Sequence, residues 1–302
     1  MIVNIDTRNH SCAGYVAEYV TLLKLLIEAA GHQVGNAETS TCHIFIEGFG
    51  SGFNAKMKAV KGKGDVIIVT SELVTGTTFN GWPDYAHATG QNWQKRFDNF
   101  RACAKHARAV WCGVDDPEQI GAYQAIVDCP VIPLPFAHFP AYPRFVHQQD
   151  KNIDVFFWGQ HVPYREKLIS GLKGDLAQKG FTVEYPVFVP DKERDELAAR
   201  SKIALNLKQS AQWAYPSIVR YWYHLSNASF ILGEECEKRC KLNDYVLAVP
   251  SEQLGETCVE LLGSGRWERL ATDSYERFAA ELPGGLAAEE LFDRSFSGVP
   301  KL

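Results

Sequence analysis

The chain has 302 residues, 46% of them hydrophobic and 22% charged, and its formal net charge is −5. The length favours two domains over one small core, and the composition is that of an ordinary globular protein. An acidic net charge argues against a dedicated nucleic-acid-binding protein, which usually has a basic excess. No apolar run reaches the ~20 residues of a membrane span, and no signal-peptide pattern opens the chain. We therefore expect a cytoplasmic protein.

The eight cysteines are scattered singly along the chain. Without a secretory signal, reduced and mostly buried thiols are the expectation. Cys236 and Cys240 are four residues apart, but no second Cys or His pair lies near them in sequence. Since a structural zinc site needs four ligands, we predict no metal site.

The first half of the chain alternates β-branched apolar runs with amphipathic segments. Strands are predicted at Ile2–Asp6, His43–Glu47, Asp65–Ser71, Ala109–Gly113 and Pro130–Leu134. Helices are predicted at Tyr15–Ala30, Asn54–Val60, Asn92–His106 and Pro117–Ile126. The first helix should end at Gly31, because glycine is the usual helix stop. This alternation predicts a parallel sheet with helices on both faces.

Prolines and aromatic residues crowd residues 133–150, which therefore read as neither helix nor strand. We place a linker at 135–152, between an N-terminal domain of residues 1–134 and a C-terminal domain of residues 153–302. Strands of the second half are predicted at 154–158, 181–185, 202–206, 229–232 and 245–248. Its helices are predicted at about 163–173, 191–200, 216–226, 252–262 and 265–281. We expect an α/β protein with two Rossmann-like domains that face each other across a cleft.

Four segments of the second half are informative because of their order and spacing along the chain. They are DVFFWG followed by Arg165, then SKIALNLKQ, PSIVRYWYHLSNASFIL, and a tail that runs from YVLAVPSEQLGETCVELL to RWERLATDSYERF. Together they resemble the C-terminal domain of GT-B glycosyltransferases, and more narrowly the CgeB-type, spore-maturation glycosyltransferase-like proteins. The resemblance covers roughly residues 130–280.

The resemblance implies an enzyme that transfers a sugar from a nucleotide-sugar donor to a hydroxyl acceptor, without a metal and with no cofactor beside the donor. A glycan, a protein, a small molecule or a modified DNA base could be the acceptor. Two positions depart from the family: Tyr223 stands where a Glu is common, and Ala228 where Gly is usual. These departures leave open a non-catalytic GT-B-like protein that binds a nucleotide or glycan. A sugar-nucleotide epimerase of the same architecture is a third possibility.

In open α/β sheets, ligands bind outside the carboxyl ends of the strands, and a diphosphate there needs cations or helix N-terminal N–H groups. Arg165, Lys208 and Arg220 are the predicted cations, and Ser217 opens a helix that could bind a phosphate oxygen. A surface charge or a helix cap is the alternative role for each. The predicted donor-binding residues are Gly159, Arg165, Asn206, Lys208, Ser217, Arg220, Glu234 and Glu235, the two acids as ligands for ribose.

An inverting transfer also needs a base that takes the proton of the acceptor hydroxyl. His10, Glu47 and Glu72 follow predicted strands of the first half and are the candidates. Asp84 and His87, in an aromatic-rich loop, could line an acceptor pocket. The glycine-rich turn at 48–52 lacks the full dinucleotide-binding spacing, and we expect a cleft loop there.

Overall fold

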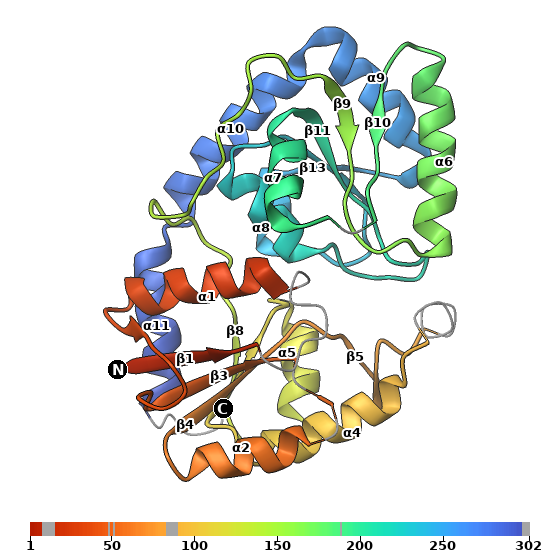
Figure 1. The fold of residues 1–302 in the computed structure, drawn as a ribbon. Coiled ribbons are helices and arrows are strands. Elements are labelled where there is room, and N and C mark those ends of the chain that lie inside the picture. Colours follow the sequence, from red (N-terminus) through yellow and green to blue (C-terminus); the bar gives the residue numbers. More distant parts are fainter. Residues whose placement is uncertain (8–15, 48, 51, 83–89, 188, 298–302) are drawn as a thin grey trace. The chain divides into compact units, whose positions relative to one another are not determined.

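The computed structural model describes residues 1–302 except 8–15, 48, 51, 83–89, 188 and 298–302 (Figure 1). Contacts divide the chain into two compact units. Unit 1 comprises Met1–Phe136 and Gly284–Leu302, and unit 2 comprises Ala137–Pro283. Each unit contains a parallel sheet with helices on its faces, so the predicted α/β class with two Rossmann-like domains is confirmed.

Unit 1 is built on a six-stranded parallel sheet of order β2-β1-β3-β4-β7-β8. Its strands are β1 (Ile2–Asp6), β2 (Gln33–Val34), β3 (Cys42–Ile46), β4 (Asp65–Thr70), β7 (Ala109–Cys112) and β8 (Val131–Pro133). A short antiparallel pair, β5 (Val74–Thr75) with β6 (Thr78–Phe79), follows β4. The chain moves from β1 to β2 on one side and returns to β3 on the other, so a topological switch point lies between β1 and β3.

The helices of unit 1 are α1 (Ala17–Ala29), α2 (Phe53–Lys61), α4 (Trp93–Ala104), α5 (Pro117–Gln124) and α11 (Gly284–Phe296). The first of these ends as predicted, with Gly31 in the left-handed region at φ 71°. Helices α1 and α11 pack together on one face of the sheet, and α2 and α4 on the other (Figure 1).

Helix α11 differs from the sequence-based boundary, which placed residues 153–302 in one C-terminal domain. It packs in unit 1, where the indole Nε1 of Trp111 donates to Ser295 Oγ at 2.9 Å. The Arg108 guanidinium donates to the carbonyls of Ser295 and Phe296 at 3.0 and 2.7 Å. The Phe292 ring meets Trp111 edge-on at 5.3 Å between centroids. These hydrogen-bond partners of α11 are 184 to 188 residues away in sequence.

Unit 2 has a five-stranded parallel sheet of order β10-β9-β11-β12-β13. Its strands are β9 (Ile153–Phe156), β10 (Val183–Glu184), β11 (Ser201–Asn206), β12 (Ile231–Glu234) and β13 (Leu247–Val249). All five fall within or next to the predicted strands. The strand order reverses between β9 and β11, which is where such sheets bind their ligands.

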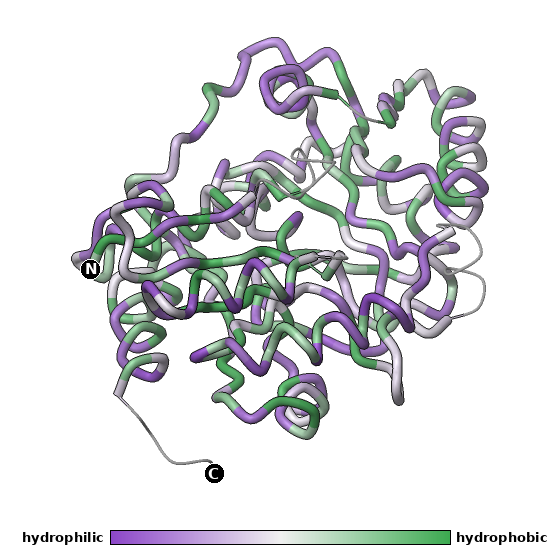
Figure 2. The backbone as a smooth tube through the Cα atoms, turned by 60° about the horizontal axis from the view of Figure 1, so that its bottom comes forward, coloured by the Kyte–Doolittle hydropathy of each residue, from purple (hydrophilic) through white to green (hydrophobic). Residues whose placement is uncertain are grey.

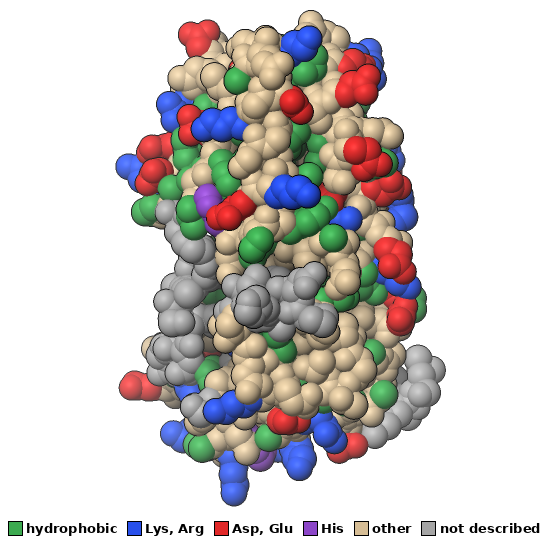
Figure 3. Space-filling view, turned by 90° about the vertical axis from the view of Figure 1, so that its right-hand side faces the viewer, with side chains coloured by type: hydrophobic (Ala, Val, Ile, Leu, Met, Phe, Trp, Pro, Cys, Tyr) green, Lys and Arg blue, Asp and Glu red, His purple; other side chains and the backbone are tan. Residues whose placement is uncertain are grey.

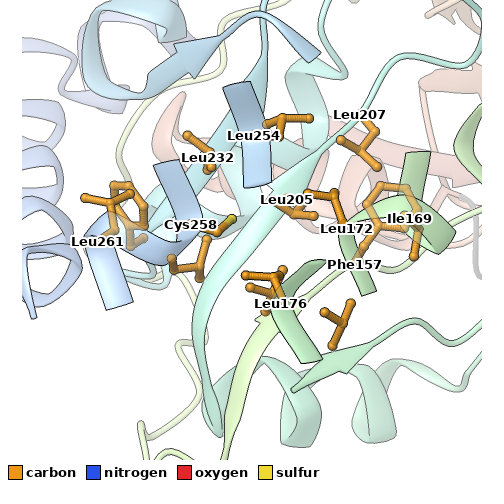
Figure 4. Close-up of a cluster of buried hydrophobic side chains, with 14 of the residues drawn as sticks. Phe157, Ile169, Leu172, Leu176, Leu205, Leu207, Leu232, Leu254, Cys258 and Leu261 are labelled. Atoms are coloured by element: carbon orange, nitrogen blue, oxygen red, sulfur yellow. The ribbon is translucent and has the colours of Figure 1, made fainter. Parts of the chain in front are cut away.

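The helices of unit 2 are α6 (Pro163–Ala177), α7 (Asp191–Ala199), α8 (Ile218–Ser226), α9 (Leu254–Ser264) and α10 (Arg266–Glu281), with short 3₁₀ turns η2 (Lys241–Tyr245) and η3 (Ser251–Gln253). One face of the sheet packs on α6 and α9 through a large apolar cluster (Figure 4). This cluster includes Phe157, Leu172, Leu205 and Cys258. It packs the strands against the two helices and so holds the ends of the strands in place. A second cluster, on the other face, includes Tyr223.

Hydropathy along the backbone follows this layering (Figure 2). The tube is hydrophobic through much of the strands, and hydrophobic and hydrophilic residues alternate along the helices. Among the described residues, no helix combines the length and the apolar character that crossing a bilayer requires.

The packing of α11 predicts that Phe292→Ala destabilises unit 1. Phe292 is 3% exposed, and removing its ring leaves a cavity against Trp111. We expect a loss of about 3–5 kcal/mol in the free energy of unfolding, measured by urea unfolding of the intact chain. The matched control is Leu286→Ala on the same helix, where the side chain is 76% exposed. Equal effects of the two variants would contradict the packing.

Candidate functional site

The carboxyl ends of β9, β11 and β12 bring together most of the residues that the sequence singled out. We call this place the β9–β11 edge; it comprises Trp158, Gly159, Tyr164, Arg165, Asn206, Lys208, Ser217, Arg220 and Glu234. The loops after β9 and β11 adjoin each other here because the two strands are neighbours. The edge lies at the switch point of the sheet.

Arg165 holds the two loops to each other. Its guanidinium donates to the carbonyls of Lys208 and Leu207 at 2.9 and 2.8 Å, and to that of Gln160 at 3.3 Å. The residue is only 3% exposed. A buried carbonyl without a donor is costly, so a cation that supplies three donors stabilises both loops.

Arg220, from the first turn of α8, makes a second bridge. Its Nη1 donates to Asn206 Oδ1 at 2.9 Å, and its Nη2 to the Trp158 carbonyl at 3.2 Å. Asn206 in turn donates from Nδ2 to the Ser217 carbonyl at 3.1 Å. Arg220 is 6% exposed. The end of β9, the end of β11 and the start of α8 are thus tied into one hydrogen-bonded unit.

Gly159 makes this approach possible. Its φ is 145°, a value that side chains rarely adopt, and a Cβ there would lie 2.9 Å from Arg220 Nη2. The glycine turn that the sequence predicted after the first strand of this half is therefore required for Arg220 to reach the Trp158 carbonyl.

The Lys208 side chain is partly exposed at this edge, and the buried Glu234 carboxylate contacts it. The Glu234 carboxylate accepts from the Lys208 backbone N–H at 2.9 Å, and its other oxygen lies 3.2 Å from Lys208 Nζ. The Tyr164 hydroxyl donates to that same oxygen. The side chain of Glu234 is 0% exposed, whereas that of Lys208 is 17% exposed. Glu234 thus fixes both ends of the lysine.

Ser217 and Glu235 make fewer contacts at the edge. Ser217 is the N-cap residue of α8, and its hydroxyl makes no capping hydrogen bond to that helix. Glu235 is exposed, and its backbone N–H donates to the Val249 carbonyl at 2.8 Å.

Tyr223, which replaces the expected Glu, points into the core of unit 2. It packs with Ile153, Phe156 and Ala198, and its hydroxyl donates to Asp195 Oδ1 at 2.5 Å. Burial is the main cause of the raised pKa of this tyrosine. Ala228, which replaces the expected Gly, has φ 53° just after α8.

In unit 1, Glu47 and Glu72 lie after the adjacent strands β3 and β4, a place we call the β3–β4 edge. Glu47 Oε1 accepts from the Ser71 backbone N–H at 3.0 Å and from the Ser71 hydroxyl. Glu72 is paired with Arg96 at 2.6 Å. Burial, and then the negative charge of Glu72, raise the pKa of Glu47 to about 8, although Arg96 opposes the shift.

Other predicted residues fall outside the described part of the chain: His10, Asp84 and His87. The sequence did not indicate several partners of these residues, namely Tyr164, Ser71, Arg96 and Asn80, whose Nδ2 donates to Glu72 Oε2 at 2.5 Å. Tyr164 and Ser71 adjoin predicted site residues, which is the one signal that could have found them. Among the described residues, no three His, Cys, Asp or Glu side chains are grouped to hold a metal ion.

Two parallel α/β units of this kind form the fold of GT-B glycosyltransferases. The crystal structure of TarM matches over 84% of this chain and 54% of that chain, at a TM-score of 0.57 and 10% sequence identity. An S. aureus TarM mutant, solved with fondaparinux, α-GlcNAc-glycerol and UDP, matches over 84% and 55% at a TM-score of 0.52 and 10% identity. The chain thus spans about half the length of these TarM chains.

At this identity the likeness concerns the fold. No sequence profile of a known family matches the chain. No curated protein matches it either. The narrower CgeB-type resemblance therefore stays a prediction.

Gly159→Ala should destabilise unit 2 by roughly 2 kcal/mol or more, because the left-handed backbone is strained and the new methyl group displaces Arg220 from the Trp158 carbonyl. Urea unfolding of the intact chain measures the loss. Gly171→Ala, in α6 with open space around it, is the control and should be neutral or slightly stabilising. A Gly159→Ala protein as stable as this control would refute the bridge.

Ala228→Gly should stabilise the chain. Ala228 and Ser229 donate to the Leu225 and His224 carbonyls, the hydrogen bonds of a helix end that prefers glycine in the left-handed position. Relief of about 1–2 kcal/mol exceeds the entropic cost of about 0.5–1 kcal/mol. We expect the Tm to rise by a few degrees, whereas Ala198→Gly inside α7 should lower it. A fall in Tm for Ala228→Gly would contradict the argument.

Proposed function

We propose that this chain is a glycosyltransferase that moves a sugar from a nucleotide-sugar donor to a hydroxyl acceptor. The donor would bind at the β9–β11 edge. The GT-B fold supports the proposal, as does the UDP in one of the matching TarM structures. The observation that carries it is the way Lys208 is held at the switch point of a parallel sheet. The buried Glu234 carboxylate binds both its backbone N–H and its side-chain ammonium group.

Lys208 is the residue we assign to the donor diphosphate. Departure of the nucleoside diphosphate leaves negative charge, which a fixed cation stabilises best because it needs no reorganisation during the reaction. The start of α8 is hydrogen-bonded to Asn206, two residues before Lys208, and the uncapped first turn after Ser217 offers backbone N–H groups to a phosphate oxygen. The two features would act on the same diphosphate.

Three buried residues next to the proposed donor site have a structural role: Arg165, Arg220 and Asn206. Their side chains are buried and hydrogen-bonded to the loops, so we assign them to loop geometry, with an indirect effect on the donor. Glu234 positions Lys208. Glu235, exposed beside it, is the acid that we propose as a ligand for ribose hydroxyls.

The acceptor is a compound with a free hydroxyl, in a glycan, a protein or a small molecule. A modified DNA base is less well supported, because the formal net charge is −5 and nucleic-acid-binding proteins usually have a basic excess. Figure 3 shows one face of the molecule, on which basic and acidic side chains are interspersed. Long nucleic acid prefers a continuous basic stripe. No cofactor beside the donor is part of the proposal.

The proposal is tested with a panel of nucleotide sugars. Each is added to the intact protein, and both the shift in Tm and the release of free nucleotide with candidate acceptors are measured. A Tm shift with nucleotide release supports the transferase. Binding without release in the presence of any acceptor would favour a binding protein, and interconversion of the donor sugar alone would favour an epimerase. If no nucleotide sugar binds, the proposal fails.

Lys208→Met combined with Glu234→Gln should weaken UDP binding about 10–100-fold, the loss of a charge-assisted contact of about 1.5–3 kcal/mol. Changing both residues avoids a buried carboxylate without a partner. Calorimetry with UDP is the measurement. The matched control is Lys202→Met with Asp154→Asn, an ion pair of 2.6 Å whose lysine lies at the start of β11, whereas Lys208 follows the end of that strand. Equal loss in both double variants would remove Lys208 from the donor site.

A further inference from the structure

The two carboxylates of the β3–β4 edge are held in different ways. Glu47 is anchored by one oxygen, Oε1, which accepts from the backbone N–H and the hydroxyl of Ser71. Its second oxygen, Oε2, has no hydrogen-bond partner among the described residues. One oxygen is thus fixed to the end of β4, and within the described residues the other has no such anchor.

Glu72, in contrast, has both oxygens engaged. Its Oε1 forms the 2.6 Å ion pair with Arg96 Nη2, and its Oε2 accepts from Asn80 Nδ2 at 2.5 Å. The Glu72 backbone carbonyl accepts from the Tyr123 hydroxyl at 2.7 Å. A carboxylate held at this many points is fixed in place, and each of its oxygens already accepts a hydrogen bond.

The backbone of Glu47 is equally well fixed. Its φ is 45°, unusual for a residue with a side chain. Its N–H donates to the Val69 carbonyl at 2.9 Å, and its carbonyl accepts from the Phe49 N–H at 2.8 Å. Hydrogen bonds on both sides hold this backbone conformation, and the backbone in turn fixes where the Glu47 side chain begins at the end of β3.

From this arrangement we infer that Glu47 is the base that takes the acceptor's proton, through Oε2, and that the Glu72–Arg96 pair acts on it through its charges. The role as base rests on the proposed transferase function. The acceptor O–H bond breaks, and the proton passes to Glu47. The hydroxyl oxygen bonds to the anomeric carbon, and the bond from that carbon to the diphosphate breaks with its electron pair on the diphosphate. The transfer inverts the anomeric configuration.

The groups around Glu47 suit this role. Burial and the Glu72 charge raise its pKa to about 8, while Arg96 and the Ser71 N–H act in the opposite direction. Tyr19 of α1 and Tyr123 of α5 also face this network, and both have raised pKa values, so they stay neutral. On the neighbouring β1, Asp6 is paired with Lys56 of α2 at 3.0 Å. A base is most effective when its pKa lies near the working pH.

The first arm of the test needs no activity. Intact protein labelled with ¹³C at Glu Cδ is titrated by NMR from pH 4 to 10, and Glu47 is assigned by the resonance that Glu47→Gln removes. We expect a midpoint well above the ordinary Glu range of about 4.3. Glu72→Gln should move this midpoint down, because it removes a like charge. An ordinary midpoint for Glu47 would overturn the inference.

Stability gives an independent readout of the same proton. Because the folded state holds it more tightly than the unfolded state, the folded protein loses relative stability as the pH rises from the unfolded pKa to the folded one. The Tm of Glu47→Gln minus that of wild type should therefore grow from pH 5 to 8 and then level off. A difference independent of pH would overturn the inference.

The second arm is the pH dependence of sugar transfer, with any donor and acceptor that the panel identifies. Glu47→Gln should lower kcat about 10²–10⁴-fold, the usual contribution of a general base. Glu72→Gln should shift the acid limb of the profile to lower pH, which a purely structural role would not do. Asp98→Asn, an exposed acid on the same helix as Arg96, should leave the profile unchanged.

The two arms separate the possible failures. Turnover that survives Glu47→Gln within a few-fold would overturn the role of Glu47 and leave the transferase proposal standing. A protein that neither binds nor turns over any nucleotide sugar would overturn the proposed function, and the role of Glu47 as base with it.

Discussion

The β9–β11 edge depends on hydrogen-bond donors for the backbone carbonyl groups that lie just beyond the strand ends. Where β9 and β11 end, their ladder hydrogen bonds end too, and the carbonyl groups of the loops that follow need other donors. Arg165 and Arg220 supply the donors. An arginine suits this task, since its planar guanidinium offers several N–H groups at fixed angles and remains charged. The β9–β11 edge is therefore built on buried arginines, whereas the Lys208 side chain is 17% exposed.

A buried cation network also imposes conditions on the residues around it. Gly159 must lack a Cβ for Arg220 to reach the Trp158 carbonyl. The rings of Phe157 and Trp158 lie under the same guanidinium, at 4.9 and 5.1 Å from their centroids. These contacts offset part of the desolvation of the charge. The short apolar run that ends in glycine is thus the surface on which Arg220 rests, as well as a strand.

Much of this arrangement is readable in the sequence. The alternation of apolar runs and helices predicted both parallel sheets, and the strand ends gathered Gly159, Arg165, Asn206, Lys208 and Arg220 at one edge, as expected. Which of these residues hold the loops and which are exposed to a ligand was not predictable. A sequence shows that an arginine follows a strand, but not whether it faces a loop carbonyl or a ligand, because that depends on where the neighbouring strand ends.

The same limit applies to α11. Its apolar positions show that residues 284–296 need a partner, yet nothing local indicates that the partner is Trp111 of unit 1. Proximity in sequence favoured the C-terminal domain, and long-range packing decided otherwise. Residues 137–283 are thus an insertion between two parts of unit 1. Glu47 and Glu72 were equally ranked for a related reason, because only the contacts of each oxygen distinguish a fixed charge from an available base.

Position 223 shows how a departure from a family pattern is resolved by packing. Tyr223 lies on the face of α8 that packs against α7, where a Glu would need a cation or donors of its own. In this chain the tyrosine fills that space, Arg194 covers its ring at 4.5 Å, and its hydroxyl donates to Asp195. The Tyr223 ring also meets Trp158 edge-on, at 5.9 Å between centroids, and Asp195 is paired with Arg194 at 2.9 Å. Packing between α7 and α8 therefore accounts for a tyrosine at this position.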